Sequence, residues 1–148
     1  RHKFFKVGLD GSFKEITAYG GRYASVSEDG KKIIFSHWGK PTREAYKGSG
    51  NGEIYEYNIG SGKYSRLTHT DFTERYPVYS FSKKNAVYFA ASDGKVFQLY
   101  KAENNNFETR QQLTDFAIWS VRDLSIAKNK DLLVFEKFDE LWKYDDFI

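Results

Sequence analysis

The chain has 148 residues with 23 basic and 20 acidic side chains, a formal net charge of +3, and neither cysteine nor methionine. This length fits one domain, the lack of cysteine excludes disulfides, thiolate metal sites and cysteine nucleophiles, and the scattered charges predict no nucleic-acid partner. The longest apolar runs are only a few residues, which excludes a membrane-spanning helix. Because the first residue is not methionine, we expect the chain to be trimmed or cut from a longer protein.

Short alternating segments rich in Tyr and Phe begin at the N-terminus, and such residues favour β-strands. Residues 3–17 (KFFKVGLDGSFKEIT) predict two strands joined by an Asp-Gly turn, since this dipeptide tolerates a positive φ. Residues 21–36 (GRYASVSEDGKKIIFS) predict a second hairpin, and residues 53–68 (EIYEYNIGSGKYSRLT) predict a third. The long, Gly-rich and basic stretch at residues 37–52 is expected to be an insertion.

Hairpins of the same two kinds alternate along the rest of the chain. Residues 75–92 (RYPVYSFSKKNAVYFAAS), 95–114 (KVFQLYKAENNNFETRQQLT) and 120–137 (SVRDLSIAKNKDLLVFEK) each predict two strands around a polar corner. Pro77 suits the start of a strand, where its missing N–H costs no ladder bond. Residues 139–148 (DELWKYDDFI) repeat the start of the segment at residue 53, so a further hairpin begins there.

An aliphatic–threonine pair ends three of these segments, at residues 16–17, 67–68 and 113–114, which lie 51 and 46 residues apart. This spacing is typical of propeller blades. With two hairpins in each repeat, the sequence predicts an all-β fold, a β-propeller fragment of about three four-stranded antiparallel blades. The expected units are an outer half-blade at residues 3–17, blades at 22–68 and 75–114, and an incomplete blade at 119–148.

The residues that carry this repeat resemble those of known propellers. The Leu-Thr pair at 67–68, the Pro-Val-Tyr-Ser run at 77–80 and the Ser-Glu-Asp-Gly-Lys run at 27–31 look like the blade repeat of TolB, of the tricorn protease and of prolyl-oligopeptidase-type propellers. Residues 45–58, followed by 67–80, are similar to the corresponding part of tricorn-like peptidases. The central copy has Phe-Ser-Lys-Lys where those blades carry Pro-Asp-Gly-Lys.

No catalytic motif occurs in the sequence. His2, His37 and His69 lie far apart, and none has a second ligand at a metal spacing, so we interpret them as surface histidines. The GSGNG run at residues 48–52 lacks the lysine and the helix of a phosphate-binding loop, and no nucleophile elbow or zinc-protease motif is present. We therefore expect no catalytic residue, cofactor or metal in this chain, and whether the parent protein is a serine peptidase stays open.

The propeller resemblance implies a site at the mouth of the central channel, where the loops that lead into the inner strands meet. Cationic and aromatic side chains at such a mouth can hold an extended peptide or its terminal carboxylate. The alternative interpretation is structural, with the aromatic side chains wedged between blades and the arginines paired with acids such as Glu74 or Asp123. The expected binding residues are Arg22, Tyr23, Arg75, Tyr76, Trp119, Arg122 and Asp123.

Three functions follow from the resemblance. The chain is expected to be a non-catalytic segment that binds or guides a peptide or protein, as in the propeller of a tricorn-like serine peptidase; the alternatives are a TolB-like protein-interaction scaffold and a propeller that binds a glycan or small ligand. The likeness to TolB favours a periplasmic or extracytoplasmic location. An uncovered blade face of about 300 Å² forgoes roughly 8 kcal/mol, so we expect further blades from the parent chain or a second copy as partners.

Overall fold

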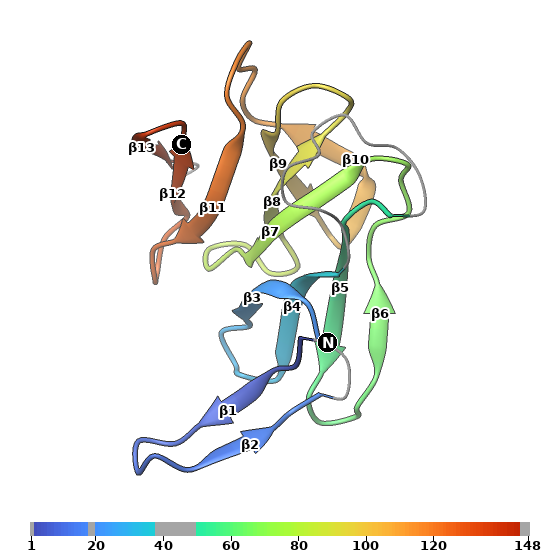
Figure 1. Ribbon diagram of the computed structural model, residues 1–148, viewed down its shortest axis with the longest axis vertical. Coiled ribbons are helices and arrows are strands. Elements are labelled where there is room, and N and C mark those ends of the chain that lie inside the picture. The colour runs from blue at the N-terminus through green and yellow to red at the C-terminus, as the bar shows by residue number, and fades with distance from the viewer. Residues whose placement is uncertain (1, 18–19, 38–49, 146–148) are drawn as a thin grey trace.

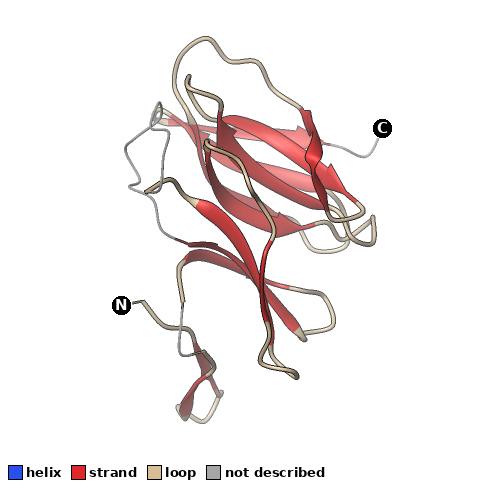
Figure 2. Cartoon of the chain, turned by 90° about the vertical axis from the view of Figure 1, so that its right-hand side faces the viewer, coloured by secondary structure: helices blue, strands red, loops and turns tan. Residues whose placement is uncertain are grey.

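The structure is a computed structural model that describes residues 2–17, 20–37 and 50–145 (Figure 1). Every regular element in those ranges is a β-strand, which confirms the all-β expectation (Figure 2). The strands form four antiparallel sheets of two, four, four and three strands. No helix in this part of the chain could cross a membrane. Most of the expected insertion, residues 38–49, lies outside the described residues.

Strands that follow one another in the sequence pair with one another, so each sheet is a simple meander: β1-β2, β3-β4-β5-β6, β7-β8-β9-β10 and β11-β12-β13. The sheets follow one another around an arc, and the first strands β3, β7 and β11 lie on its inner side (Figure 1). The strands are β1 (Phe5–Val7), β2 (Phe13–Glu15), β3 (Arg22–Val26), β4 (Lys32–His37), β5 (Glu53–Asn58), β6 (Tyr64–Arg66), β7 (Thr73–Tyr79), β8 (Val87–Ser92), β9 (Gln98–Glu103), β10 (Asn106–Gln112), β11 (Val121–Ile126), β12 (Leu132–Lys137) and β13 (Glu140–Asp145).

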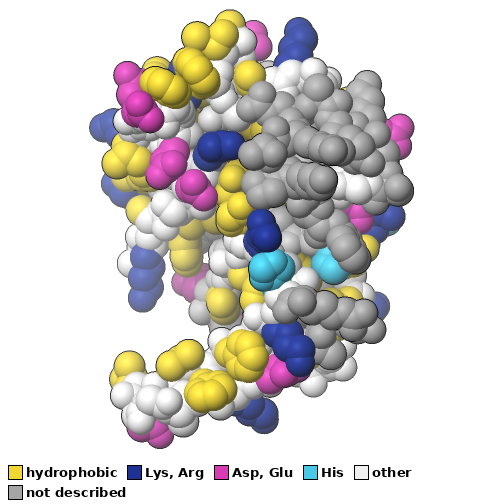
Figure 3. Space-filling view, in the orientation of Figure 1, with side chains coloured by type: hydrophobic (Ala, Val, Ile, Leu, Met, Phe, Trp, Pro, Cys, Tyr) yellow, Lys and Arg dark blue, Asp and Glu magenta, His cyan; other side chains and the backbone are white. Residues whose placement is uncertain are grey.

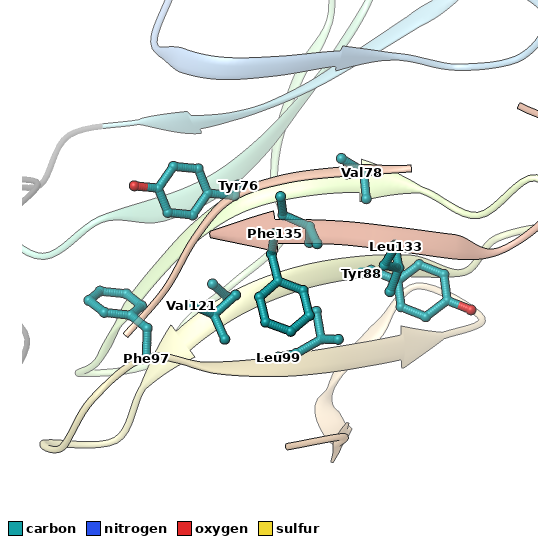
Figure 4. Close-up of a cluster of buried hydrophobic side chains, with 10 residues drawn as sticks. Tyr76, Val78, Tyr88, Phe97, Leu99, Val121, Leu133 and Phe135 are labelled. Atoms are coloured by element: carbon teal, nitrogen blue, oxygen red, sulfur yellow. The ribbon is translucent and has the colours of Figure 1, made fainter. Parts of the chain in front are cut away.

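The central sheet β7–β10 is covered on both faces, so its second strand β8 is buried along its whole length. Alternate residues of a strand point to opposite faces, and Tyr88 accordingly faces the last sheet while Phe89 faces the sheet β3–β6. Figure 4 shows Tyr88 and Leu99 of the central sheet close to Leu133 and Phe135 of β12. Apolar packing between neighbouring sheets therefore holds the arc together.

The aliphatic–threonine pair has a defined role after the fourth strand. The N–H of Leu67 donates to the carbonyl oxygen of Ile54 at 2.8 Å, and the N–H of Ile54 donates to Thr68 Oγ1 at 2.9 Å. The pair at residues 113–114 holds Leu99 of β9 in the same way, at 2.8 and 2.9 Å. Two consecutive residues thus satisfy both backbone groups of one third-strand residue, which explains why the pair recurs.

We predict that Thr68→Val lowers the free energy of unfolding by about 2 kcal/mol, because the buried N–H of Ile54 loses its acceptor while the volume of the side chain is kept. Thr68 itself is fully buried, so water cannot replace the hydroxyl. Urea unfolding measures the change, and Thr68→Ser, which retains a hydroxyl, is the control. Equal losses for the valine and serine variants would contradict the assigned hydrogen bond.

Asp131, the residue before β12, joins the last sheet to the central one. It is fully buried, and its carboxylate accepts hydrogen bonds from the hydroxyls of Ser80 and Ser82, both at 2.6 Å, from the hydroxyl of Tyr88 at 2.8 Å, and from the N–H of Phe81 at 2.9 Å. Burial acts to raise the pKa of Asp131, but the hydrogen bonds outweigh burial and hold that pKa below its ordinary value of 3.8. The turn that departs from the Pro-Asp-Gly-Lys pattern thus binds a carboxylate of the next sheet.

Candidate channel-mouth site

The inner strands β3, β7 and β11 share one irregularity. In each of them an arginine pairs with the second strand, and directly after it the register shifts in a β-bulge. The arginine pairs are Arg22 with Ser36, Arg75 with Ala90, and Arg122 with Glu136. The residues that follow have left-handed φ values: Tyr23 (56°), Tyr76 (54°) and Asp123 (47°). A non-glycine residue is uncommon in that region, and a bulky one such as tyrosine is costly there, so the recurrence of the left-handed position in three successive sheets marks the bulge as a repeated element of the blade.

The bulges bring Tyr23 and Tyr76 together. Their ring centroids lie 4.3 Å apart with the planes tilted by 53°. Tyr76 is only 6% exposed and belongs to the core between the central and last sheets. Burial, together with the nearby Tyr23 and the Asp123 carboxylate, raises the pKa of Tyr76 above its ordinary value. Tyr76 is therefore a neutral, packed side chain. It contacts Tyr23 in the bulge of β3 and lies near the carboxylate of Asp123 in the bulge of β11.

Arg75 is also inside the protein. Its side chain is 3% exposed, and its guanidinium lies 5.3 Å from the centre of the Phe97 ring. Burial lowers the pKa of Arg75, whereas Tyr76 and Tyr23 act in the opposite direction. The burial of Arg75 and Tyr76 is what the structural interpretation expects, and a direct role of either side chain in binding stays a prediction.

The arginine–acid pairs of that interpretation are arranged differently from the expectation. Glu74 is fully buried and pairs with Arg110 Nη1 at 2.8 Å. Arg110 also pairs with Asp93 at 2.9 Å, and its guanidinium stacks on the Tyr100 ring at 4.9 Å. Burial raises the pKa of Glu74, although its bonds to Thr70 and Arg110 oppose this. The cation that compensates Glu74 comes from β10, the fourth strand of the same sheet, and sequence reasoning did not anticipate it.

The remaining predicted residues lie at the surface. Arg22, Arg122 and Asp123 are exposed, Tyr23 is half-buried, and Trp119 is 48% exposed. Arg22 Nε donates to His2 Nε2 at 3.2 Å, so the N-terminal segment reaches the first inner strand. The structure therefore divides the predicted residues into a buried pair and an exposed group.

Trp119 has a partner that the sequence analysis missed. It stacks on Phe138 with ring centroids 4.3 Å apart and an angle of 24° between the planes. Phe138 is 59% exposed at φ 56° in the turn between β12 and β13, and Ile118 beside Trp119 is 62% exposed. Figure 3 shows hydrophobic side chains gathered at the top of this face, where Figure 1 places the loop that leads into β11. Two-residue turns usually carry small polar residues. The aromatic Phe138 in such a turn was therefore the sequence signal that could have revealed this contact.

Other kinds of site find little support in the described ranges. No group of three His, Asp or Glu side chains in residues 2–17, 20–37 and 50–145 could hold a metal ion. A pocket of about 290 Å³ lies on the β9–β10 hairpin, away from the inner strands. It is lined by Lys101, Glu103, Asn104, Asn106, Thr109 and Gln111, with no aromatic side chain on which a sugar ring could stack.

Solved structures share this arrangement of sheets. TolB from Acinetobacter baumannii matches 97% of the chain with a TM-score of 0.71 at 18% sequence identity. A protein assigned as TolB from Agrobacterium tumefaciens matches 93% with a TM-score of 0.65 at 23% identity. The tricorn protease matches 97% with a TM-score of 0.60 at 14% identity. The chain folds as part of a β-propeller. The expected TolB-like and tricorn-like propeller fragment of about three four-stranded blades is confirmed at the level of the fold.

The chain spans only part of these propeller proteins: 35% and 44% of the two TolB structures and 19% of the tricorn protease. At identities below 25% the likeness concerns the fold, and function has to be argued from the residues of the site. Neither a protein-family model nor a curated protein sequence matches the chain.

Proposed function

We propose that this chain is a non-catalytic β-propeller segment that binds or guides an extended peptide or protein segment where its inner strands begin. The observation that carries the proposal is the set of exposed side chains around the start of β11: the stacked Trp119 and Phe138 rings, and Arg122 in β11 itself. Aromatic faces cover apolar side chains at a low entropic cost. An arginine binds a carboxylate through two parallel hydrogen bonds.

In this proposal the buried pair supports the exposed group. Tyr76 packs against the Tyr23 ring on one side and lies near Asp123 on the other. The guanidinium of Arg75 rests on Phe97, whose carbonyl oxygen accepts the N–H of Val121 at the start of β11 at 3.0 Å. Arg75 and Tyr76 thus fix the position of β11, and the exposed side chains of β11 carry the ligand contact.

We predict that Arg122→Ala weakens binding of extended peptides with a free C-terminal carboxylate about tenfold, the loss expected when one charge-assisted hydrogen-bonded pair is removed. Amidation of the peptide C-terminus should cause a similar loss in the unaltered chain and little further loss in Arg122→Ala. Fluorescence anisotropy with a labelled peptide pool measures both effects. The matched control is Lys130→Ala, which removes an exposed cation from the turn at the other end of β11. Equal weakening by Lys130→Ala would contradict a local role for Arg122.

Two other functions remain alternatives at the same surface. A TolB-like scaffold would bind a folded partner, so amidation of a peptide would be irrelevant, and loss of Trp119 would matter more than loss of Arg122. A glycan-binding propeller would use the Trp119 and Phe138 rings, and a glycan array without signal removes it. We also propose, from the likeness to TolB alone, that the parent protein is extracytoplasmic. The tricorn protease is, by its name, a peptidase. From the likeness to it we propose that the parent protein of this chain also contains a peptidase domain.

We propose further that additional blades cover the outer face of the last sheet. Leu141 of β13 lies opposite Glu136, as Ile54 lies opposite Ser36 in the first four-stranded sheet. Ile54 is fully buried by the central sheet, whereas Leu141 is 77% exposed. Leu141 thus exposes an aliphatic side chain at the position where the first four-stranded sheet has a fully buried one. An exposed apolar side chain at such a position indicates a face that another sheet covers.

A further inference from the structure

The third strands β5, β9 and β13 carry an aromatic ring at the same register position. The rings are Tyr55, Tyr100 and Trp142, and each lies opposite a phenylalanine of the second strand. In each sheet the residue after that phenylalanine pairs with the bulge arginine of the inner strand. The three rings are therefore equivalent, and what lies on them can be compared from sheet to sheet.

A basic side chain lies on each of these rings. The pairs are His37 on Tyr55, with ring centroids 5.0 Å apart, Arg110 on Tyr100, with the guanidinium 4.9 Å from the ring centre, and Lys137 on Trp142, with the ammonium 4.9 Å from the ring centre. A cation within about 6 Å of an aromatic ring centre is attracted by the negative face of the ring. The third-strand ring thus supports a basic group in all three sheets.

In the first two of these sheets the basic side chain also meets an oxygen acceptor of the protein. His37 Nδ1 donates to the carbonyl oxygen of Gly20 at 3.2 Å. Arg110 pairs with the carboxylates of Glu74 and Asp93 at 2.8 and 2.9 Å. The ring and an oxygen acceptor together therefore satisfy the basic group at this position.

Lys137 has two rings but no oxygen acceptor among the described residues. Its ammonium lies 4.7 Å from the centre of the Phe116 ring as well as 4.9 Å from that of Trp142, and the two rings meet edge to face with centroids 5.4 Å apart. Glu140, which lies opposite Lys137 in the strand pair, instead accepts the indole N–H of Trp142 at 2.9 Å. Strand β12 thus ends in a half-buried cation that is held between two rings.

This cation lies at the same end of the last sheet as the proposed peptide surface. The residue opposite Lys137 on β11 is Val121, which directly precedes Arg122, and the residue after Lys137 is Phe138, on which Trp119 stacks. Neighbouring residues of a strand point to opposite faces, so Arg122 and Lys137 lie on the two faces of one end of the sheet. An extended peptide that crosses this end can place a carboxylate on each of them.

We propose that Lys137 is a second anion-binding residue of the peptide surface, and that it selects ligands with an acidic side chain upstream of their C-terminus. This role rests on the proposed function, in which Arg122 binds the terminal carboxylate. The two rings restrict the ammonium before the ligand arrives, which reduces the entropy that is lost on binding. A ligand carboxylate gives Lys137 the oxygen contact that Arg110 has within its own sheet.

The test compares labelled peptides that carry a single Glu, placed at successive positions before a free C-terminus, with matched peptides that carry Gln. Fluorescence anisotropy with the full chain should show about fivefold tighter binding of the Glu peptide at the best position. Lys137→Met removes the charge but keeps an unbranched side chain against the rings, and it should abolish this preference. Lys137→Arg should keep the preference, because a guanidinium also stacks on aromatic rings.

Lys143→Met is the matched control, because Lys143 is an exposed lysine of β13 on the other face of the same sheet. It should leave the preference for Glu at about fivefold. The indole N–H signal of Trp142 provides a second readout by NMR. It should shift with the Glu peptide more than with the Gln peptide, and this difference should disappear in Lys137→Met. A lysine that acted only in packing would produce no such difference.

The contacts of Arg122 and Lys137 respond to different changes in the peptide. Amidation of the C-terminus tests Arg122, whereas replacement of Glu by Gln tests Lys137. If amidation weakened binding while Glu and Gln peptides bound equally at every position, the role of Lys137 would be wrong and the proposed function would stand. An unchanged preference for Glu in Lys137→Met would also overturn that role. So would tighter binding of a Lys peptide to Lys137→Met than to the original chain, since the rings would then bind a cation of the ligand.

Discussion

Tyr76→Ala is expected to lower the free energy of unfolding by about 4 kcal/mol, the usual cost of removing a large buried aromatic side chain. Tyr76 is 6% exposed, its ring lies against Tyr23, and it belongs to the core shared by the central and last sheets. Its loss would leave a cavity at the place where three sheets approach one another. Urea unfolding monitored by far-UV circular dichroism measures the change.

The control for this prediction is Trp119→Ala, which removes a larger ring from the exposed end of β11. Because Trp119 is 48% exposed and stacks on Phe138, which is itself exposed, we expect its loss to change the free energy of unfolding by about 1 kcal/mol or less. Its effect should appear in peptide binding instead. If Tyr76→Ala remained as stable as the original chain and lost peptide binding alone, Tyr76 would belong to the ligand surface after all.

The fold could be predicted because its signals are local and repeated. Each hairpin combines alternating aromatic residues with a turn of Gly, Asn or Asp, and both signals lie within about twenty residues. The Leu-Thr pair at residues 67–68 was visible as a repeat, although its cause, the two bonds to Ile54, requires a neighbouring strand to be placed. Periodicity therefore predicted the sheets before any contact was known.

The candidate site could be predicted only in part. The expectation that Arg75 and Tyr76 face a channel mouth followed from their place before a strand, yet they lie inside β7, whose residues 73–78 are all buried, and a bulge follows Arg75. Nothing in the local sequence marks that bulge, because neither Gly nor Asn stands at the left-handed position. Phe138 was missed because Trp119, the residue on which it stacks, lies in the segment before β11 and is distant in the sequence.

Charge pairs between strands were the hardest to predict. Glu74 and Arg110 are 36 residues apart in the sequence, and Asp131 is about fifty residues from the serines that bind it. A buried carboxylate looks like an ordinary surface acid until its partners are placed beside it. The turn at residues 80–82 is an example. In the sequence it only departs from the expected blade pattern, whereas in the structure it donates hydrogen bonds to the carboxylate of Asp131.

Asp131→Asn should lower the free energy of unfolding by about 3 kcal/mol at pH 7. The amide presents two N–H donors to a site whose four partners all donate hydrogen bonds, so some buried donors lose their acceptor. Because the hydrogen bonds lower the pKa of Asp131 in the folded state, the carboxylate stabilises the fold above its ordinary pKa of 3.8, and this contribution is lost as the pH falls through the folded-state pKa. The difference between the two chains should therefore shrink below about pH 4.

Asp139→Asn is the matched control for Asp131, because Asp139 is exposed in the turn that follows the same strand. It should change the free energy of unfolding by about 0.5 kcal/mol or less at either pH. Urea unfolding at pH 7 and at about pH 3 separates the two acids. A constant difference between the original chain and Asp131→Asn over this range would mean that packing, not the ionised carboxylate, joins the last sheet to the central one. The position of β11, and with it the proposed peptide surface, depends on that junction.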